Sequence, residues 1–481
     1  MASFSALETA KRGILAQKFG FDVTNNNIQN INTPGYSRRS AVFTETPPLR
    51  STSGAYVGTG VASHSLRTYR EELFDKDVRT AMGRQSSFTA EQSIYERLEA
   101  LLSEPSDNGI GESVNSLFAS FEQAANNPEN LNLRNHILQN AKTLVKNLHY
   151  TAGSFATARQ DIYRDTQNNI ESTNQLLEQI AGLNKKIGQT KAETGIEAQT
   201  FVDQREIALE KLSKLTGSHI MHEKNGQVNV FIDGINVVTS EHFSKLRLAE
   251  NTNATTGEVT LSILKTDPNG VQNGSVAPIS GELSAQLKGY NVIFDPKDSS
   301  GEYSAYTKIN EYVNTLATKI NALTTTGFGL NDPAGPAPAR NFFLPATGPI
   351  TAENIQLNPA LENNPADIPL ASVTGEAGNN TIGRAIARLA NDTTFLNGYS
   401  PSGAYSSILG KVGMMSQEAI GGSKTMKMVV QQLESQRESL IGVNLDEEAV
   451  NIVKYQRAFE ASSRVVNTTN ELLQTIINLA R

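Results

Sequence analysis

LDEEAVNIVKYQRAFEASSRVVNTTNELLQTIINLAR, residues 445–481, is the stretch that decides the fold of this chain. Every seventh residue in it is apolar, and neither glycine nor proline interrupts the run. This spacing predicts one long helix with a continuous apolar seam. The seam consists of Leu445, Ile452, Phe459, Val466, Leu473 and Ala480.

The first thirty residues repeat the pattern at Leu7, Ile14, Phe21 and Ile28. Glycines within this segment each cost roughly 1 kcal/mol of helix stability relative to alanine. Each seam needs a partner, and the nearest candidate is the other terminus. We therefore predict that the two ends of the chain pair as helices. The pattern by itself fits an ordinary intramolecular coiled coil as well as it fits a surface for assembly.

The composition argues against several classes of protein. Hydrophobic residues make up 38% and charged residues 19% of the 481 positions, which is typical of a folded globular protein. The formal net charge of −7 argues against nucleic acid or an anionic membrane as the main partner. The chain has no cysteine, so disulfides and thiol chemistry are excluded. No apolar run reaches the roughly twenty residues of a membrane-spanning helix.

Helical periodicity dominates the interior of the chain. Helices are expected over 67–104, 113–126, 131–190, 196–215, 284–290 and 309–325, and from about 381 to the end with an interruption at Gly421-Gly422. From Gly217 the period changes, and Asn225-Gly226 indicates a hairpin turn. Strands are expected over 220–223, 227–232, 235–238, 245–248 and 259–264. Residues 331–370 hold eight of the 17 prolines, which predicts an irregular excursion rather than a packed layer.

The expected fold is mainly α, with a long-helix bundle, a terminal coiled-coil region of N- and C-terminal helices, and an inserted β-rich domain. We assign residues 1–60 and 441–481 to a terminal assembly region. The bundle takes 61–216 and 376–440. Residues 217–375 form a β-rich outer domain with a proline-rich loop.

Three segments resemble the signatures of one protein family. Residues 27–36, NIQNINTPGY, resemble the signature of bacterial flagellar axial proteins, and the continuation Ser37-Arg38-Arg39 narrows the resemblance to the FlgK family of hook–filament junction proteins. Asp203-Gln204-Arg205 is similar to that family's motif at the start of a bundle helix. Residues 444–448, NLDEE, and 455–461, YQRAFEA, resemble its C-terminal signature. The axial-protein motif residues are Asn30, Asn32, Thr33, Pro34, Gly35 and Tyr36.

The resemblance implies a structural, self-assembling subunit of the flagellum at the junction between hook and filament. Terminal helices would line an inner tube, the bundle would form the next shell, and the β-rich domain would face outward. The implied partners are other copies of the chain, the hook protein, the second junction protein, and an export chaperone at the C-terminal helix. The implied location is extracellular, reached through flagellar type III export. The N-terminus also lacks the apolar block of a cleaved signal peptide.

Two other functions stay open from the sequence. A rod or hook subunit would share the Asn-Thr-Pro-Gly-Tyr turn, although the long bundle and the Ser-Arg-Arg continuation count against it. A secreted enzyme or binding protein would need its activity in 217–375.

No catalytic, cofactor-binding or metal-binding residues are expected. Asp446, Glu447 and Glu448 fit the first turn of a helix capped by Asn444, where the helix dipole favours acidic side chains. His219, His222, Glu223 and His242 include an i, i+3 histidine pair on an expected strand, which points the two rings to opposite faces. Gly421 to Thr425 lacks the glycine that precedes lysine in a phosphate-binding loop.

The polar residues within the C-terminal seam weaken an isolated helix pair, so we predict that both ends are largely unfolded in the free monomer and order on assembly. The polar residues are Ser462, Ser463, Thr468, Thr469 and Asn470. Such coupled folding consumes about 2–5 kcal/mol of interaction energy and prevents premature polymerisation. Amide hydrogen exchange on the monomer should be fast in both termini and slow in 131–190. Strong protection of both termini would contradict this expectation.

Overall fold

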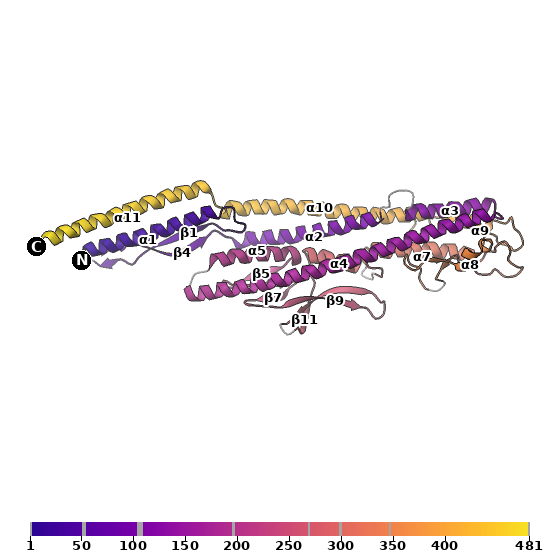
Figure 1. Cartoon of the computed structure of the whole chain (residues 1–481), viewed down its shortest axis with the longest axis horizontal. Helices are drawn as coiled ribbons and strands as arrows, with labels where there is room; N and C mark the ends of the chain where they lie inside the picture. The colour runs from indigo at the N-terminus through magenta and orange to yellow at the C-terminus, as the bar shows by residue number, and fades with distance from the viewer. Residues whose placement is uncertain are drawn as a thin grey trace.

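The computed structural model of the chain describes residues 2–50, 54–102, 109–194, 198–267, 270–297, 301–345 and 348–479. The molecule is a long rod of helices, with both chain ends at one end and small β-sheets along one side (Figure 1). The predicted fold class, mainly α with a bundle, paired terminal helices and an inserted β-rich part, is confirmed. The predicted helix ends at 103–104 and 196–197, and the seam residue Ala480, lie outside the described residues.

The terminal region consists of two antiparallel helices and a β-hairpin. Helix α1 (Ala2–Gln29) lies along α11 (Leu445–Leu479), as predicted for the two chain ends. Gly13 faces Ser462, Gly20 faces Tyr455, and Asn27 faces Glu448. In each pair the two residue numbers add up to 475, so one register holds along the whole contact.

The hairpin extends the terminal region beyond its predicted boundary at residue 60. Strand β1 (Arg39–Glu45) pairs with β4 (Val61–Thr68), and both pack on α1. The short strands β2 (Leu49–Arg50) and β3 (Tyr56–Val57) pair near its tip. The helix predicted from residue 67 therefore starts later, at Glu72, because Arg67 and Thr68 belong to the ladder and the Tyr69 N–H donates to the Arg38 carbonyl.

Five helices form the long bundle, and one hydrophobic core runs through most of it. Leu98, Phe121 and Phe155 are fully buried in this core. The five helices are α2 (Glu72–Leu102), α3 (Ile110–Asn126), α4 (Leu131–Thr194), α5 (Gln199–Thr216) and α10 (Pro401–Ile441). Near its far end, α9 (Thr381–Arg388) packs on α3.

The predicted interruption at Gly421-Gly422 is wrong, because α10 continues through it. A Cβ at Gly422 would lie 2.5 Å from the Phe88 ring of α2. The glycine thus lets two long helices approach closely instead of breaking one of them. The predicted helix from 381 onward does break elsewhere, between α9 and α10 and again at Gly442.

The β-rich part follows the predicted strands and lies against α4 and α5. The predicted Asn225-Gly226 turn joins β5 to β6, and Gly226 has a φ of 86°. Val228, Val230 and Val238 are fully buried in a second core that the two helices complete. The four-stranded sheet contains β5 (His219–His222), β6 (Val228–Ile232), β7 (Ile235–Thr239) and β8 (His242–Phe243), and the three-stranded sheet contains β9 (Lys245–Thr252), β10 (Val259–Thr266) and β11 (Gln272–Val276).

The β-rich part ends at Val276, and the chain then returns to the bundle. Helices α6 (Glu282–Lys288) and α7 (Ala305–Thr324), with a π-helix at Gly289–Ile293 between them, join the main core. The segment 331–370 fits the predicted irregular excursion only in part: residues 333–341 are largely exposed and lack regular structure, whereas Phe342, Phe343 and the apolar residues of 350–370 pack over the far end of the bundle. We call it the cap. Its buried apolar side chains include Phe342, Phe343, Ile355, Leu361, Ile368 and Leu370.

Asparagine side chains of α7 explain how a proline-rich segment with little regular structure can be buried. The short elements of the cap are β12 (Phe343–Leu344), β13 (Gln356–Leu357) and α8 (Pro359–Asn363). Asn321 donates to the Phe343 carbonyl at 2.9 Å and accepts from the N–H groups of Phe342 and Phe343. Asn310 and Asn314 accept from two further backbone N–H groups of the cap. Side chains thus replace the sheet or helix bonds that buried backbone requires.

Replacing Asn321 with alanine should lower the free energy of unfolding by about 3 kcal/mol, because buried backbone groups of Phe342 and Phe343 lose their partners. Urea unfolding followed by circular dichroism measures the change. The control is Asn168→Ala on the exposed face of α4, which should stay within about 0.5 kcal/mol of the parent. Equal effects of the two substitutions would show that the asparagine bonds do not hold the cap.

Candidate functional site

The three sequence signatures meet at one place, where the terminal region joins the bundle. After α1 the axial-protein motif forms a tight turn, in which the Thr33 N–H and hydroxyl donate to the backbone and side chain of Asn30. Gly35 has a φ of 75°, and a Cβ there would lie 2.7 Å from Ile207 of α5. Only glycine fits this position. Asn32 and Pro34 are exposed and line a shallow cleft between the turn and the end of α10.

Asn27 holds the turn together from within. Its side-chain NH2 donates to the Arg39 carbonyl at 2.8 Å and to Glu448 at 3.2 Å. Its oxygen accepts from the Arg39 N–H and from the Tyr36 hydroxyl, the latter at 2.7 Å. Burial raises the pKa of Tyr36, so its phenol stays protonated and donates this bond. Asn27 is 1% exposed, and its bonds link α1, β1 and α11.

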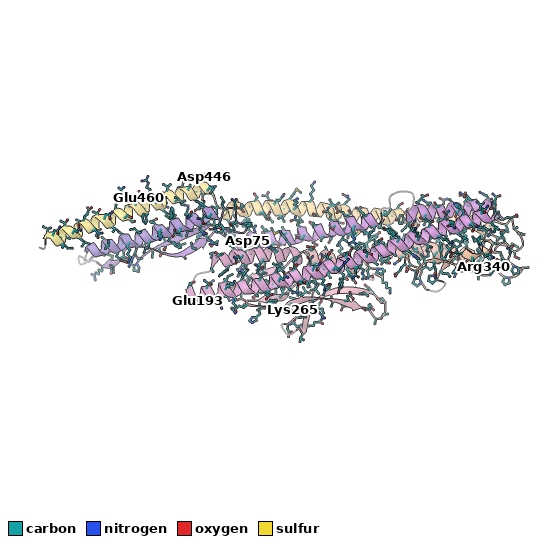
Figure 2. All side chains as sticks on the ribbon, in the orientation of Figure 1. Asp75, Glu193, Lys265, Arg340, Asp446 and Glu460 are labelled. Carbon is teal, nitrogen blue, oxygen red and sulfur yellow. The ribbon has the colours of Figure 1, made fainter. Side chains whose placement is uncertain are left out.

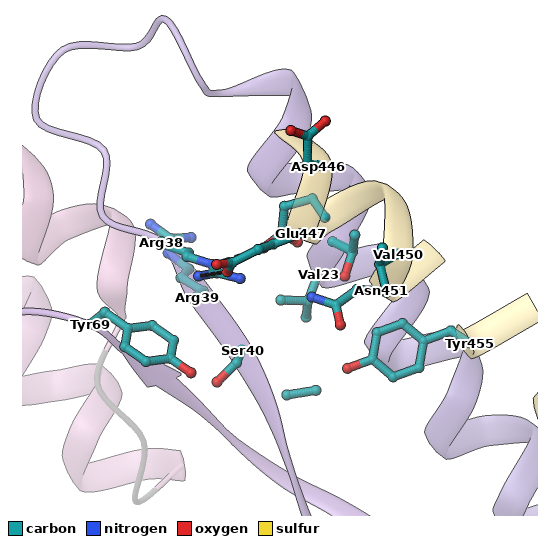
Figure 3. A pocket seen from close by; sticks show the side chains of 13 residues that line it. Val23, Arg38, Arg39, Ser40, Tyr69, Asp446, Glu447, Val450, Asn451 and Tyr455 are labelled. Carbon is teal, nitrogen blue, oxygen red and sulfur yellow. Dashed lines mark hydrogen bonds and ion pairs between the residues drawn. The ribbon is translucent and has the colours of Figure 1, made fainter. Parts of the chain in front are cut away.

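Arg38 ties the start of β1 to α11. Its guanidinium lies 2.7 Å from Glu447 and 2.8 Å from Glu448. The backbone N–H of Arg38 donates to the Ile441 carbonyl at the end of α10. Figure 3 shows Arg38 and Glu447 meeting between β1 and the first turn of α11, with Tyr69 and Tyr455 at the two ends of the same cleft. As predicted, Asn444 caps this helix through the Asp446 N–H.

Arg39 and Arg70 bind the terminal region to α5 through one carboxylate. Asp203 accepts from Arg39 at 2.7 Å and from Arg70 at 3.0 Å, and Arg70 also contacts Asp75 at 2.7 Å. Asp203 is 7% exposed. Burial raises the pKa of Asp203, although the two arginines act in the opposite direction.

The ion pairs continue into the bundle as a network. Glu206 of α5 accepts from Arg79 of α2 at 2.5 Å. Arg437 of α10 lies 2.5 Å from Glu210 and 3.6 Å from Asp75. Figure 2 shows Asp75 at the end of the bundle that adjoins the terminal region. We name the whole network the arginine joint. Its members are Arg38, Arg39, Arg70, Arg79, Arg437, Asp75, Asp203, Glu206, Glu210, Glu447 and Glu448.

The Asp203-Gln204-Arg205 motif contacts two different parts of the molecule. Asp203 faces the terminal region, whereas Arg205 donates to Asn184 of α4 and to the Gly226 carbonyl in the turn of the first β-hairpin. One turn of α5 therefore fixes the terminal region and the β-rich part to the same helix. The sequence resemblance identified this motif but gave no partner for either residue.

Three facing pairs mark the closest approach of α1 and α11: Gly13 with Ser462, Gly20 with Tyr455, and Asn27 with Glu448. A Cβ at Gly20 would lie 2.7 Å from the Tyr455 ring. The role of the seam residues in assembly stays a prediction. Leu7, Ile14, Phe21, Ile28, Ile452, Val466 and Leu473 are half-buried, and Leu445 and Phe459 are exposed.

Two of the seam residues, Phe21 of α1 and Phe459 of α11, border an open groove. Its volume is 600 Å³, and the rest of its lining is Gln17, Lys18, Tyr455, Gln456 and Glu460. The hairpin covers the opposite side of the helix pair, where Gly60 approaches Thr9 and Val465 lines the cleft. The terminal region therefore has one covered face and one open apolar face.

Helix α11 carries further apolar side chains that this chain leaves exposed. They are Leu445, Val450, Val453, Phe459, Val465, Leu472, Ile476, Ile477 and Leu479. Exposed apolar side chains in this number on one helix are typical of an element that associates with another protein.

The histidine group and the Gly421–Thr425 segment, considered above as possible sites, are parts of ordinary secondary structure. His222 of β5 lies 3.4 Å from Glu72, and the Gly421–Thr425 segment is inside α10. Within the described residues, no group of three or more histidines and acidic residues could hold a metal ion. Among the same residues, none of the helices is long and apolar enough to cross a membrane.

Comparison with known proteins agrees with the signatures. The family described as flagellar hook-associated protein FlgK helical domain matches residues 95–343, just over half of the chain. The family of the flagellar basal body rod FlgEFG protein C-terminal matches residues 439–479.

Full-length relatives and solved structures also match this chain. Flagellar hook-associated protein 1 of Bacillus subtilis strain 168 is 24% identical over 514 residues, covering 99% of this chain and 98% of the relative. The protein of the same name from Salmonella typhimurium strain LT2 is 24% identical over 560 residues, covering 99% and 100%. The structure of the flagellar hook junction protein FlgK from Burkholderia pseudomallei has the same fold, with a TM-score of 0.62, 14% identity, and coverage of 76% of this chain and 100% of that one.

The fold and these findings define a structural protein of the bacterial flagellum, from a family that is not an enzyme family. The chain belongs to the FlgK family of flagellar hook-associated proteins.

Replacing Asp203 with asparagine should lower the free energy of unfolding by about 3 kcal/mol, because Arg39 and Arg70 would remain buried without a counter-charge. Thermal and urea unfolding of the full chain give the value. Asp165→Asn, at an exposed position of α4, serves as the control for the loss of one negative charge. If the two variants were equally stable, the arginine joint would contribute little to holding the terminal region.

Proposed function

We propose that this protein is the structural subunit that forms the junction between the flagellar hook and filament, and that it polymerises through its terminal helices. The observation that carries the proposal is the open apolar groove along α1 and α11, since nothing in the described chain covers it. The names of the full-length relatives support a place beside the hook.

The division of the chain supports a layered assembly. The terminal helices, residues 1–60 and 441–481 extended by β4, form the inner tube. The bundle of 61–216 and 376–440, together with the cap, forms the next shell, and the β-rich part of 217–276 faces outward. The arginine joint then lies between the two shells and sets the angle at which they meet.

Assembly follows export through the flagellar type III apparatus. The exposed apolar side chains of α11 would aggregate in the cytosol, so an export chaperone covers this helix before secretion. At the cell exterior the partners are other copies of this chain, the hook protein on one side and the second junction protein on the other.

Deleting residues 445–481 in the source bacterium should leave hooks without filaments and release filament protein into the medium. Electron microscopy of the cells and immunoblots of the medium measure both effects. Normal filaments on these cells would refute the proposed role.

Two point variants distinguish the effect of changing the groove from the effect of changing α11 elsewhere. Phe459→Ser removes an aromatic side chain from the groove and should reduce filaments as the deletion does. Arg457→Ser changes a neighbouring side chain that is 77% exposed and does not line the groove, and it should leave filaments normal. Immunoblots of secreted protein for each variant separate a failure of assembly from a failure of export.

A further inference from the structure

Strand β9 of the β-rich part has one edge without a partner strand. The strand order in its sheet is β11-β10-β9, so β9 pairs only with β10. At the other edge, the Leu246 N–H donates to the side chain of Asn174 of α4 at 2.7 Å, and the Leu246 carbonyl accepts from the same side chain at 2.9 Å. The backbone groups of Leu246 therefore point away from β10.

The backbone groups of Leu248 and Glu250 point the same way, because every second residue of an antiparallel strand faces away from its partner. The register between β9 and β10 is regular from Lys245 to Thr252, so no bulge changes this alternation. No described residue bonds to the N–H and carbonyl groups of Leu248 and Glu250. Such a row of unpaired groups is a template for another strand.

A groove of 410 Å³ follows this edge, and we call it the edge groove. Residues 245–248 all line it. Because successive side chains of a strand point to opposite faces, the edge groove runs along the edge of the sheet rather than over one face. Its other wall is a stripe of α4 from Tyr163 to Glu178, about 22 Å long. Figure 1 shows β9 beside α4, on the side of that helix remote from α10.

The two faces of β9 give the edge groove two different chemistries. Leu246 is buried in the core that α4 shares with the sheets, so Leu246 and Leu248 are on the face toward α4, where Tyr163 also lines the groove. Lys245 and Arg247 are on the opposite face, are exposed, and form no ion pair with a described residue. A strand added beside β9 places its own side chains alternately on these two faces.

We propose that the edge groove binds an extended segment of another protein in which apolar and acidic residues alternate. The segment adds a strand to β9 by bonding to the backbone of Leu248 and Glu250. Its apolar side chains pack on Leu248 and Tyr163, and its acidic side chains pair with Arg247 and Lys245. The length of the groove suits about six residues at 3.4 Å each. The two cations repel a basic strand, so they also select the partner.

Binding of a synthetic peptide to the purified full-length chain tests the two chemistries. The probe is a short fluorescent peptide in which valine and aspartate alternate, and fluorescence anisotropy measures its dissociation constant. A peptide in which valine and lysine alternate should bind at least tenfold more weakly. The variant Arg247→Glu should reduce this preference for the aspartate peptide at least tenfold, because one of the two cations becomes an anion.

A second pair of variants tests the backbone bonds. Glu250→Pro removes an N–H group that points away from β10, and edge strands accept proline at such positions. This variant should bind the aspartate peptide at least tenfold more weakly than the parent. The matched control is Glu250→Ala, which loses the same side chain, keeps the N–H group and should bind at least as tightly as the parent. Circular dichroism of each variant confirms that it is folded.

Several outcomes would overturn the inference. They are no saturable binding of the aspartate peptide, equal binding of the two peptides, and equal affinities of the proline and alanine variants. If sedimentation showed dimers of the chain alone that Glu250→Pro dissociates, the occupant would be a second copy and not a different protein. The inference does not depend on the proposed junction role, because each measurement uses the purified chain and leaves residues 445–481 in place.

Discussion

The carboxylate of Asp203 is buried between the guanidinium groups of two arginines. Such a buried charge is stable only while its counter-charges stay in place. Arg39 reaches it from the terminal hairpin and Arg70 from the segment before α2. The chain crosses between the terminal region and the bundle at residues 68–72 and 441–445, and the joint binds both crossings through Arg70 and Arg38. Because ion pairs are directional, the joint fixes an orientation in a way that apolar packing alone would not.

The helix pair on the other side of the joint follows a different principle. Glycines at positions 13 and 20 leave room on α1 for two side chains of α11, Ser462 and the Tyr455 ring. Phe21 and Phe459 border the groove on the open face. The chain thus gives up internal burial, which would stabilise the free subunit, and keeps that apolar surface for contacts with other molecules.

The sequence predicts the parts of this structure that depend on local pattern. Seven-residue periodicity located the long helices, Asn225-Gly226 located the hairpin, and the Asn-Thr-Pro-Gly-Tyr turn located one side of the joint. It could not supply the partners of Arg38 and Arg39, which lie 410 and 164 positions away. It also misjudged the cap, because the role of Asn321 depends on a loop that only the folded core brings near. The sequence pattern also could not show that Gly13 and Gly20 meet Ser462 and Tyr455 at the closest approach of the two terminal helices.

The length of helix α4 constrains the rest of the molecule. Its 64 residues form a continuous strut of about 96 Å, which runs from the cap back past the β-rich part (Figure 1). Inserting one residue in it would lengthen the strut by about 1.5 Å and turn everything beyond by about 100°, so α3 or α5, which pack along it, would lose their register with it. The alignments with relatives extend to 514 and 560 residues, so those chains hold segments that this one lacks. Such additions are compatible with the strut only in the loops, the cap and the β-rich part, so these parts can vary in size while the strut keeps its length.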